Sequence, residues 1–200
     1  MAELAGKSAS IKISGAATSF TGEATTTDDN QNYQITSATK RVWDRATTPT
    51  VLDDGIATTE SYTVNKLTGT ITFATVDALR GVVTVTGKYL PMTTATYAHE
   101  FSYNRGVDLM EVNKFGDTHK ACLAGTKFAS GTLSQWDVTS EYFADALTAG
   151  NPVVIEFLYE IGADPIRVWA LLESNEMQAA IGNPQDNIVS FISTDELLDN

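Results

Sequence analysis

One short stretch of the chain has the hydrophobic period of a helix, whereas most of the remainder alternates as strands do. Phe143 and Leu147 lie four residues apart and share an apolar stripe with Ala146. Capping side chains at positions 137–140 precede this stripe, and Gly150, followed by Asn-Pro, ends it. We therefore predict one short helix whose core packing residues are Phe143 and Leu147, and we expect an aspartate at either position to abolish folding.

The segment after this helix, from Pro152 to Tyr159, alternates with the two-residue period of a strand. Its apolar face carries Val153, Ile155, Phe157 and Tyr159. The opposite face carries Glu156 and Glu160. The helix is too short to be stable alone in water, so we expect it to dock on this strand. We expect the face with the two glutamates to meet water or a partner subunit.

Short alternating runs separated by turn residues fill the chain from Tyr33 to Leu90. The clearest pair, residues 61–64 and 70–73, is joined by a loop with Asn and Gly, where a positive φ is easiest. Asp28-Asp29-Asn30 and Asp53-Asp54-Gly55 are turn signals. Further strands are predicted at residues 33–35, 41–43, 49–52 and 82–90. This spacing is typical of a sandwich or a barrel.

The second half continues with strands on either side of the helix. Residues 93–104 alternate as a strand, which Arg105-Gly106 is expected to end in a turn. A run of small residues and glycines then leads as a strand to Trp136. We predict strands at residues 166–172 and 188–193, a short helical turn at residues 173–181 and a mobile acidic end at residues 195–200.

Together these patterns predict a mainly β protein with antiparallel β-sandwich or barrel-like sheets, flanked by one short α-helix and carrying extended hairpin or loop insertions. The length of 200 residues suits a single domain, residues 1–200. Within it, residues from about 30 to 92 form a β-rich portion or insertion.

The composition disfavours negatively charged partners. The net charge is -12 and the pI is about 4.4, so the surface repels the phosphates of nucleic acids and anionic membranes. No apolar run reaches the roughly 18 residues of a membrane helix, and the start of the chain lacks the hydrophobic core of a signal peptide. Cys122 is the single cysteine, and we expect a buried, reduced thiol.

No group of residues has the arrangement that catalysis or metal binding requires. His99 and His119 lack a histidine or cysteine at zinc-ligand spacing. The acidic turns lack the alternating spacing of a calcium loop, and Asx side chains that stabilise turns explain them. Cys122 has no histidine in a nucleophile context, and the lysine-serine end of a phosphate loop is absent. We therefore predict no enzyme, no catalytic residue, no cofactor and no metal.

The three tryptophans leave one alternative open. Trp43, Trp136 and Trp169 could line a sugar-binding face, although tryptophans in β proteins more often lie in a core or an interface. Many strands without a catalytic site favour a structural or interaction role, because strand edges are templates for another chain.

Six motifs in order carry a family resemblance: SFTGEATT, YQITSATKRVWD, SYTVNKLTGTITF, GVVTVTGKYLP, FGDTHKACLAGTKFASGTLSQWD and EYFADALTAGNPVVIEFLYE. In this order, and covering about residues 8–159, they resemble the major tail tube proteins of long-tailed, non-contractile bacteriophages. The family has no catalytic signature, and the residues beyond 165 match least clearly.

The resemblance implies a subunit that assembles with itself into hexameric rings, in which one sheet of each subunit joins a barrel around a channel. Rings stack head to tail into a tube through which DNA passes without specific binding. Tail tip, tape-measure and tail terminator proteins would be its other partners, without a membrane. The protein would be assembled in the host bacterial cytoplasm and would reside in the virion.

Glu156 and Glu160 are the candidate lumen-facing or subunit-facing residues under this resemblance, because they share the non-core face of one strand. Replacing Glu156 with Lys is then expected to spare the fold and to change the tube interior or its contacts. The alternative is a β-sandwich module that binds carbohydrate, through Trp43 or Trp169, or that serves as another virion accessory protein.

Overall fold

A computed structural model describes residues 9–95, 97–112, 118–119, 121–136, 142–158, 164–178 and 186–198. The chain divides into two compact units. Unit 1 comprises Met1–Lys12 and Thr94–Asn200, and unit 2 comprises Ile13–Thr93. We predicted one domain with a β-rich portion at about residues 30–92, and that prediction stays untested. The structure divides the chain between residues 12 and 13 and between residues 93 and 94.

The described chain is mainly β, with two antiparallel sheets and one short α-helix, which confirms the predicted fold class. The strands are β1 Ser10–Ser14, β2 Thr18–Thr26, β3 Asn32–Ile35, β4 Thr50–Asp53, β5 Ile56–Ala57, β6 Tyr62–Asn65, β7 Thr70–Phe73, β8 Val83–Tyr89, β9 Met92–Thr94, β10 Ala98–Glu111, β11 Cys122–Trp136, β12 Val153–Leu158, β13 Ile166–Gln178 and β14 Asp186–Leu198. The helix α1 spans Tyr142–Ala149, and the 3-10 helix η2 spans Ala38–Lys40.

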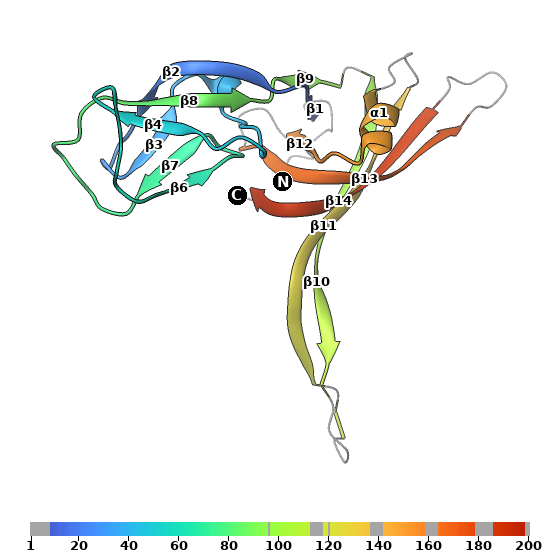
Figure 1. Cartoon of the computed structure of the whole chain (residues 1–200). Coiled ribbons are helices and arrows are strands. Elements are labelled where there is room, and N and C mark those ends of the chain that lie inside the picture. The colour runs from blue at the N-terminus through green and yellow to red at the C-terminus, as the bar shows by residue number, and fades with distance from the viewer. Residues whose placement is uncertain are drawn as a thin grey trace, which may run out of the picture. The chain divides into compact units, whose positions relative to one another are not determined.

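Unit 2 is built on a seven-stranded sheet with the order β5-β4-β8-β2-β3-β7-β6 (Figure 1). Its two edge strands, β5 and β6, are short. Only four residues, 58–61, connect them, so the sheet curls to bring its two edges near each other. Alternate side chains point inward and form one buried core. The core residues are Phe20, Tyr33, Ile35, Trp43, Val51, Ile71, Phe73, Val83 and Val85.

The predicted turns of unit 2 form as their residues require. β6 and β7 pair as the expected hairpin, and Gly69 in their loop has a φ of 64°. Asp54 and Gly55, which join β4 to β5, both have positive φ, as a two-residue turn between antiparallel strands requires. Asp29 Oδ1 accepts hydrogen bonds from the backbone N–H groups of Gln31 and Asn32 at 3.0 and 2.7 Å, so this acidic motif is a turn stabilised by its own side chain.

The strand expected at residues 41–43 is absent, which corrects the sequence prediction. Ala38–Lys40 form η2 instead, and Trp43 makes only an isolated bridge to Tyr89. The indole Nε1 of Trp43 donates to the Lys40 carbonyl at 2.8 Å, and its ring is buried in the core. Burial of this ring therefore holds residues 41–43 outside a regular strand, which outweighs their local preference for one.

The second sheet, which we call the sheet of unit 1 because β10 to β14 lie wholly in that unit, contains seven strands in the order β10-β11-β14-β13-β12-β1-β9. Its centre is an aromatic cluster around Phe157, whose ring lies 5.2 Å from that of Phe101, 5.6 Å from Tyr103 and 5.7 Å from Phe191, measured between centroids. These rings come from β10, β12 and β14, so the cluster joins strands that are distant in sequence. Aromatic packing of this kind stabilises the unit beyond simple area burial.

The helix α1 ends at Gly150, whose φ of 63° and N–H bond to the Leu147 carbonyl form the predicted left-handed end. It packs mainly against β13 rather than against β12, the strand that follows it in sequence. This corrects the predicted docking strand. The connection from helix to β12 is only Gly150–Pro152, so the chain enters the sheet at once and the helix lies over the neighbouring strand.

Three further expectations for unit 1 are wrong, and in each case strand pairing overrides a local signal. Arg105-Gly106 does not turn the chain, because β10 continues through both residues in register with β11. Residues 173–178 are strand rather than helix, because β13 pairs with β14 from Arg167 to Gln178, with two irregularities in register. The acidic end is ordered to residue 198, because Leu197 and Leu198 pair with Val168 and Arg167.

Gly131 lies where β11 passes closest to its neighbours. A Cβ at this position would clash with the carbonyl oxygen of Ser102 and would lie 2.8 Å from Cζ of Phe191. We expect Gly131→Ala to lower the free energy of unfolding by about 2–3 kcal/mol, as overpacking a tightly packed site does. Gly15→Ala, whose Cβ would lie at an ordinary 3.5 Å from the Pro91 carbonyl oxygen, is the control. Urea unfolding followed by circular dichroism measures both, and equal stabilities would contradict the close packing.

Candidate interaction surface

A two-stranded ribbon extends from the sheet of unit 1 (Figure 1). It consists of β10 from Gly106 to Glu111 and of β11 from Cys122 to Phe128, and in the described chain these strand residues form ladder pairs only with each other. β14 covers β11 only from Ser130 to Trp136. The ribbon therefore lies outside the core of its own unit, where a two-stranded hairpin has little stability of its own.

Close backbone packing holds the two strands of the ribbon together. Gly106 lies opposite Phe128, and a Cβ on Gly106 would come within 2.5 Å of Cζ of that ring. Glycine at this position therefore lets the aromatic ring lie across the neighbouring strand. A register shift between Val107 and Leu109 increases the local twist, as a bulge does.

The distal part of the ribbon exposes large apolar side chains on both faces. Met110 lies directly opposite Leu123 on one face, and Leu109 lies on the other. Their exposed fractions are 60%, 57% and 68% respectively. Such a concentration of exposed side chains on an unsupported ribbon is typical of a surface that another protein covers. We call Leu109, Met110 and Leu123 the ribbon cluster.

Cys122 lies on the same ribbon and is exposed, which corrects the expectation of a buried thiol. It pairs with Glu111 across the ribbon. The preference of cysteine for burial does not apply here, because the ribbon has no core in which to bury it.

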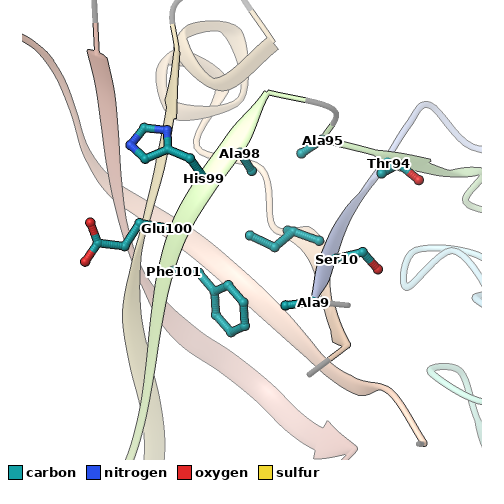
Figure 2. A pocket seen from close by; sticks show the side chains of 9 residues that line it. Ala9, Ser10, Thr94, Ala95, Ala98, His99, Glu100 and Phe101 are labelled. Carbon is teal, nitrogen blue, oxygen red and sulfur yellow. The ribbon is translucent and has the colours of Figure 1, made fainter. Parts of the chain in front are cut away.

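β10 is also an edge strand of its sheet, since only β11 pairs with it in the described part of the chain. Beside it lies a hollow of about 500 Å³ between β10 and β1. Figure 2 shows Phe101 and Ala98 on the side of β10 that faces β1, with Ala9 and Ala95 across the gap, whereas His99 and Glu100 lie on the other side of the strand. Small side chains along an open strand edge leave room for an added strand.

Glu156, one of the two predicted lumen-facing or subunit-facing residues, is 3% exposed. Its Oε1 lies 2.6 Å from Nζ of Lys12 on β1, and its Oε2 lies 2.7 Å from Nε of Arg167 on β13. The neighbouring Val154 on the same face is also buried, so this face does not meet water within the unit, which corrects that part of the expectation, whereas contact with a partner subunit stays a prediction. The reason is that neighbouring side chains cover both faces of β12. Glu160 lies outside the described residues.

The two cations decide the protonation state of Glu156. Burial alone would raise the pKa of its carboxyl. The hydrogen bonds and charges of Lys12 and Arg167 lower this pKa by more than burial raises it, so the pKa falls below the usual value of 4.5. The carboxylate is therefore charged at neutral pH and links three strands, β1, β12 and β13.

The predicted helix packing residues differ in burial. Phe143 is buried, and Leu147 is half-buried. Among the helix side chains that the structure describes, Phe143 in the first turn is the buried one.

The described residues include no group of three or more His, Cys, Asp or Glu side chains placed to hold a metal ion. His99 stacks on Trp136 with centroids 5.3 Å apart, and its Nε2 lies 3.6 Å from Oδ2 of Asp186. Trp43 and Trp169 are buried, whereas Trp136 is about half exposed. Within the same residues, no helix has the length and apolar character to span a membrane.

The sequence pattern does not predict the ribbon cluster, because Arg105-Gly106 has the composition of a turn that would end the strand before it. One signal was available: Val107, Leu109, Met110 and Val112 place apolar residues on both faces of an extended segment. A half-buried strand would instead alternate between apolar and polar residues.

Comparison with known proteins gives a partial likeness in structure. No family model matches the chain, and no curated protein matches it. Among solved structures, a chain from the tail of an empty gene transfer agent particle with C6 symmetry aligns with a TM-score of 0.47 and 10% identity, covering 55% of this chain and 87% of that one. A chain from the virion of a native gene transfer agent particle aligns with a TM-score of 0.46 and 10% identity, covering 53% and 86%.

Proposed function

We propose that the chain is a structural subunit of a phage-like tail, which assembles with itself into stacked hexameric rings that form the tail tube. The observation that carries this proposal is the β10–β11 ribbon, with Leu109, Met110 and Leu123 exposed beyond the core of unit 1. A monomer gains nothing from this arrangement, whereas a neighbouring subunit could cover all three side chains.

The open edge of β10 supports the same proposal. A strand from a neighbouring subunit could pair with it, so that the sheets of successive subunits join around a ring. In such a ring each contact joins two different surfaces, which close around the axis, while contacts between rings stay open along it. The sequence motifs that resemble tail tube proteins support the hexameric number and the stacking.

The charge of the chain fits a channel through which DNA passes. With a net charge of -12, the surface repels phosphates, so DNA would slide through the tube without specific binding. Glu156 contributes little to this effect, because Lys12 and Arg167 neutralise it and the protein buries it. Tail tip, tape-measure and tail terminator proteins would complete the assembly, which forms in the host cytoplasm and remains in the virion.

Negative-stain electron microscopy of the purified full chain tests the proposal. We expect sixfold rings or tubes, which grow in number as the protein concentration rises. A strictly monomeric protein at high concentration, also in the presence of the other tail proteins, would contradict it and would favour an accessory virion protein. The carbohydrate-binding alternative was expected to use Trp43 or Trp169, and both are buried; Trp136, which is about half exposed, is the one tryptophan whose ring a sugar could reach.

A further inference from the structure

Three segments of unit 2 are bound together at one end of its sheet. They are the turn at residues 27–31, the β4–β5 turn with the residues after it, 53–60, and the loop at residues 74–82 between β7 and β8. The N–H of Asp77 donates to the Asn30 carbonyl at 3.4 Å, and the N–H of Val82 donates to Oδ1 of Asp54 at 2.8 Å. We call this region the acidic end of unit 2.

Four large aliphatic side chains at the acidic end are exposed. Ile56, Val76, Leu79 and Val82 are between 63% and 93% exposed. Single exposed aliphatic residues are ordinary. Four exposed aliphatic residues on segments that are hydrogen-bonded to one another are unusual, because a monomer gains no burial from any of them.

Arg80 holds the loop that carries these side chains in one conformation. Its side chain is 1% exposed, and its guanidinium lies 3.7 Å from the centroid of the Phe73 ring. Nη1 donates to the Asn30 carbonyl at 3.0 Å, and Nη2 forms an ion pair with Glu60. Because the loop is anchored, a partner would not have to order it on binding, which reduces the cost of association.

The charges around the aliphatic side chains have one sign. The three segments contain six acidic residues, namely Asp28, Asp29, Asp53, Asp54, Glu60 and Asp77. Their single basic residue, Arg80, is buried and forms an ion pair with Glu60, so this pair presents no net charge to a partner and five aspartates remain. Three basic residues, Lys66, Arg45 and Lys88, lie together at the other end of the unit. Nζ of Lys66 donates to the Arg45 carbonyl, and the N–H of Asp44, next to Arg45, donates to the Lys88 carbonyl.

We propose that the acidic end of unit 2 binds a protein surface whose exposed apolar side chains are surrounded by Lys and Arg. Apolar contact with Leu79 and its neighbours would supply the burial, and the basic rim would pair with the carboxylates. This site is independent of the ribbon cluster, which lies in unit 1.

The same charges exclude other occupants. A second copy of this end would oppose carboxylates with carboxylates, and nucleic acids or anionic glycans would be repelled. Neutral sugars are recognised largely through aromatic faces, and the exposed large side chains at this end are aliphatic. A basic, apolar protein surface remains.

The test uses the full chain and three synthetic peptides of equal length, measured by fluorescence anisotropy. The first alternates Leu with Lys, the second alternates Leu with Glu, and the third alternates Ser with Lys. We expect the Leu-Lys peptide to bind at least about tenfold more tightly than either of the others, because binding needs both apolar contact and opposite charge. Added salt should weaken its binding.

Two variants locate the site. Leu79→Ser with Val82→Ser should abolish the preference for the Leu-Lys peptide, and Asp28→Asn with Asp77→Asn should weaken binding of both lysine peptides. Leu109→Ser, a matched change on the ribbon, should leave peptide binding unchanged. Equal binding of all three peptides, or undiminished binding to a folded Leu79→Ser/Val82→Ser variant, would overturn the proposal. Ring formation by that same variant would still support the tube, so the two proposals can fail separately.

Discussion

A triple variant of the ribbon cluster, Leu109→Ser, Met110→Ser and Leu123→Ser, should remain folded but form no rings or tubes. The three side chains are largely exposed in the subunit, so their loss costs little in its own stability. Complete burial of one such side chain in an interface stabilises it by about 1.5–3 kcal/mol. Loss of three therefore removes on the order of 5 kcal/mol from each contact between subunits.

Electron microscopy measures the number of rings and tubes, and circular dichroism with thermal unfolding shows whether the variant is folded. The control is Val76→Ser with Val82→Ser, which makes the same chemical change on exposed residues of unit 2 and should preserve rings. Rings of normal number in the triple variant would show that the ribbon cluster does not lie between subunits.

The rate at which Cys122 is chemically labelled tests the same interface independently. It is the single cysteine of the chain and lies exposed on the ribbon. A maleimide reagent should therefore label it readily in the dissociated subunit and slowly in assembled rings. Equal labelling rates in the two states would mean that this face of the ribbon stays open to solvent after assembly.

Local patterns in the sequence predicted most of the strands, because alternation of apolar and polar residues is a property of neighbouring positions. The hairpin of β6 and β7 and the end of the helix at Gly150 were predicted for the same reason, since positive φ is a local requirement. The mainly antiparallel β class follows from these elements.

What the sequence could not predict depends on pairing between distant segments. Arg105-Gly106 has the composition of a turn, yet the partner strand β11 and the ring of Phe128 extend β10 through it. Residues 173–178 become strand because β14 pairs with them. Alternation also places Glu156 opposite the core, but it does not reveal that Lys12, 144 residues earlier in the chain, lies beside it.

Glu156 illustrates how this missing information reverses a prediction about a variant. From the strand pattern alone, Glu156→Lys should spare the fold. In the structure, a lysine at this position would place three cations, with Lys12 and Arg167, around a buried point. Breaking a buried pair in this way leaves charges uncompensated and typically costs about 3–5 kcal/mol. Because Lys12 is partly exposed and can turn to solvent, we expect a loss of about 3 kcal/mol in the free energy of unfolding.

The same carboxylate predicts a dependence of stability on pH. Its pKa in the folded chain lies below the usual 4.5, so the unfolded chain takes up a proton first as the pH falls. The stability that Glu156 contributes is thus fully present above about pH 4.5 and is lost as the pH falls through the lower folded value. Glu156→Gln cannot release or bind this proton, so its stability should be lower than wild type at pH 7 and should fall less steeply in acid.

Urea unfolding at a series of pH values between neutral and acid measures both effects. Glu173→Gln is the matched control, since this glutamate is exposed on β13 of the same unit, and it should retain the steep acid dependence of the wild type. If Glu156→Gln and Glu173→Gln lost stability in parallel with the wild type down to acid pH, the ion pairs with Lys12 and Arg167 would not hold the three strands together. In that case the cost of Glu156→Lys should also shrink toward that of a surface substitution, within about 0.5 kcal/mol of the wild type.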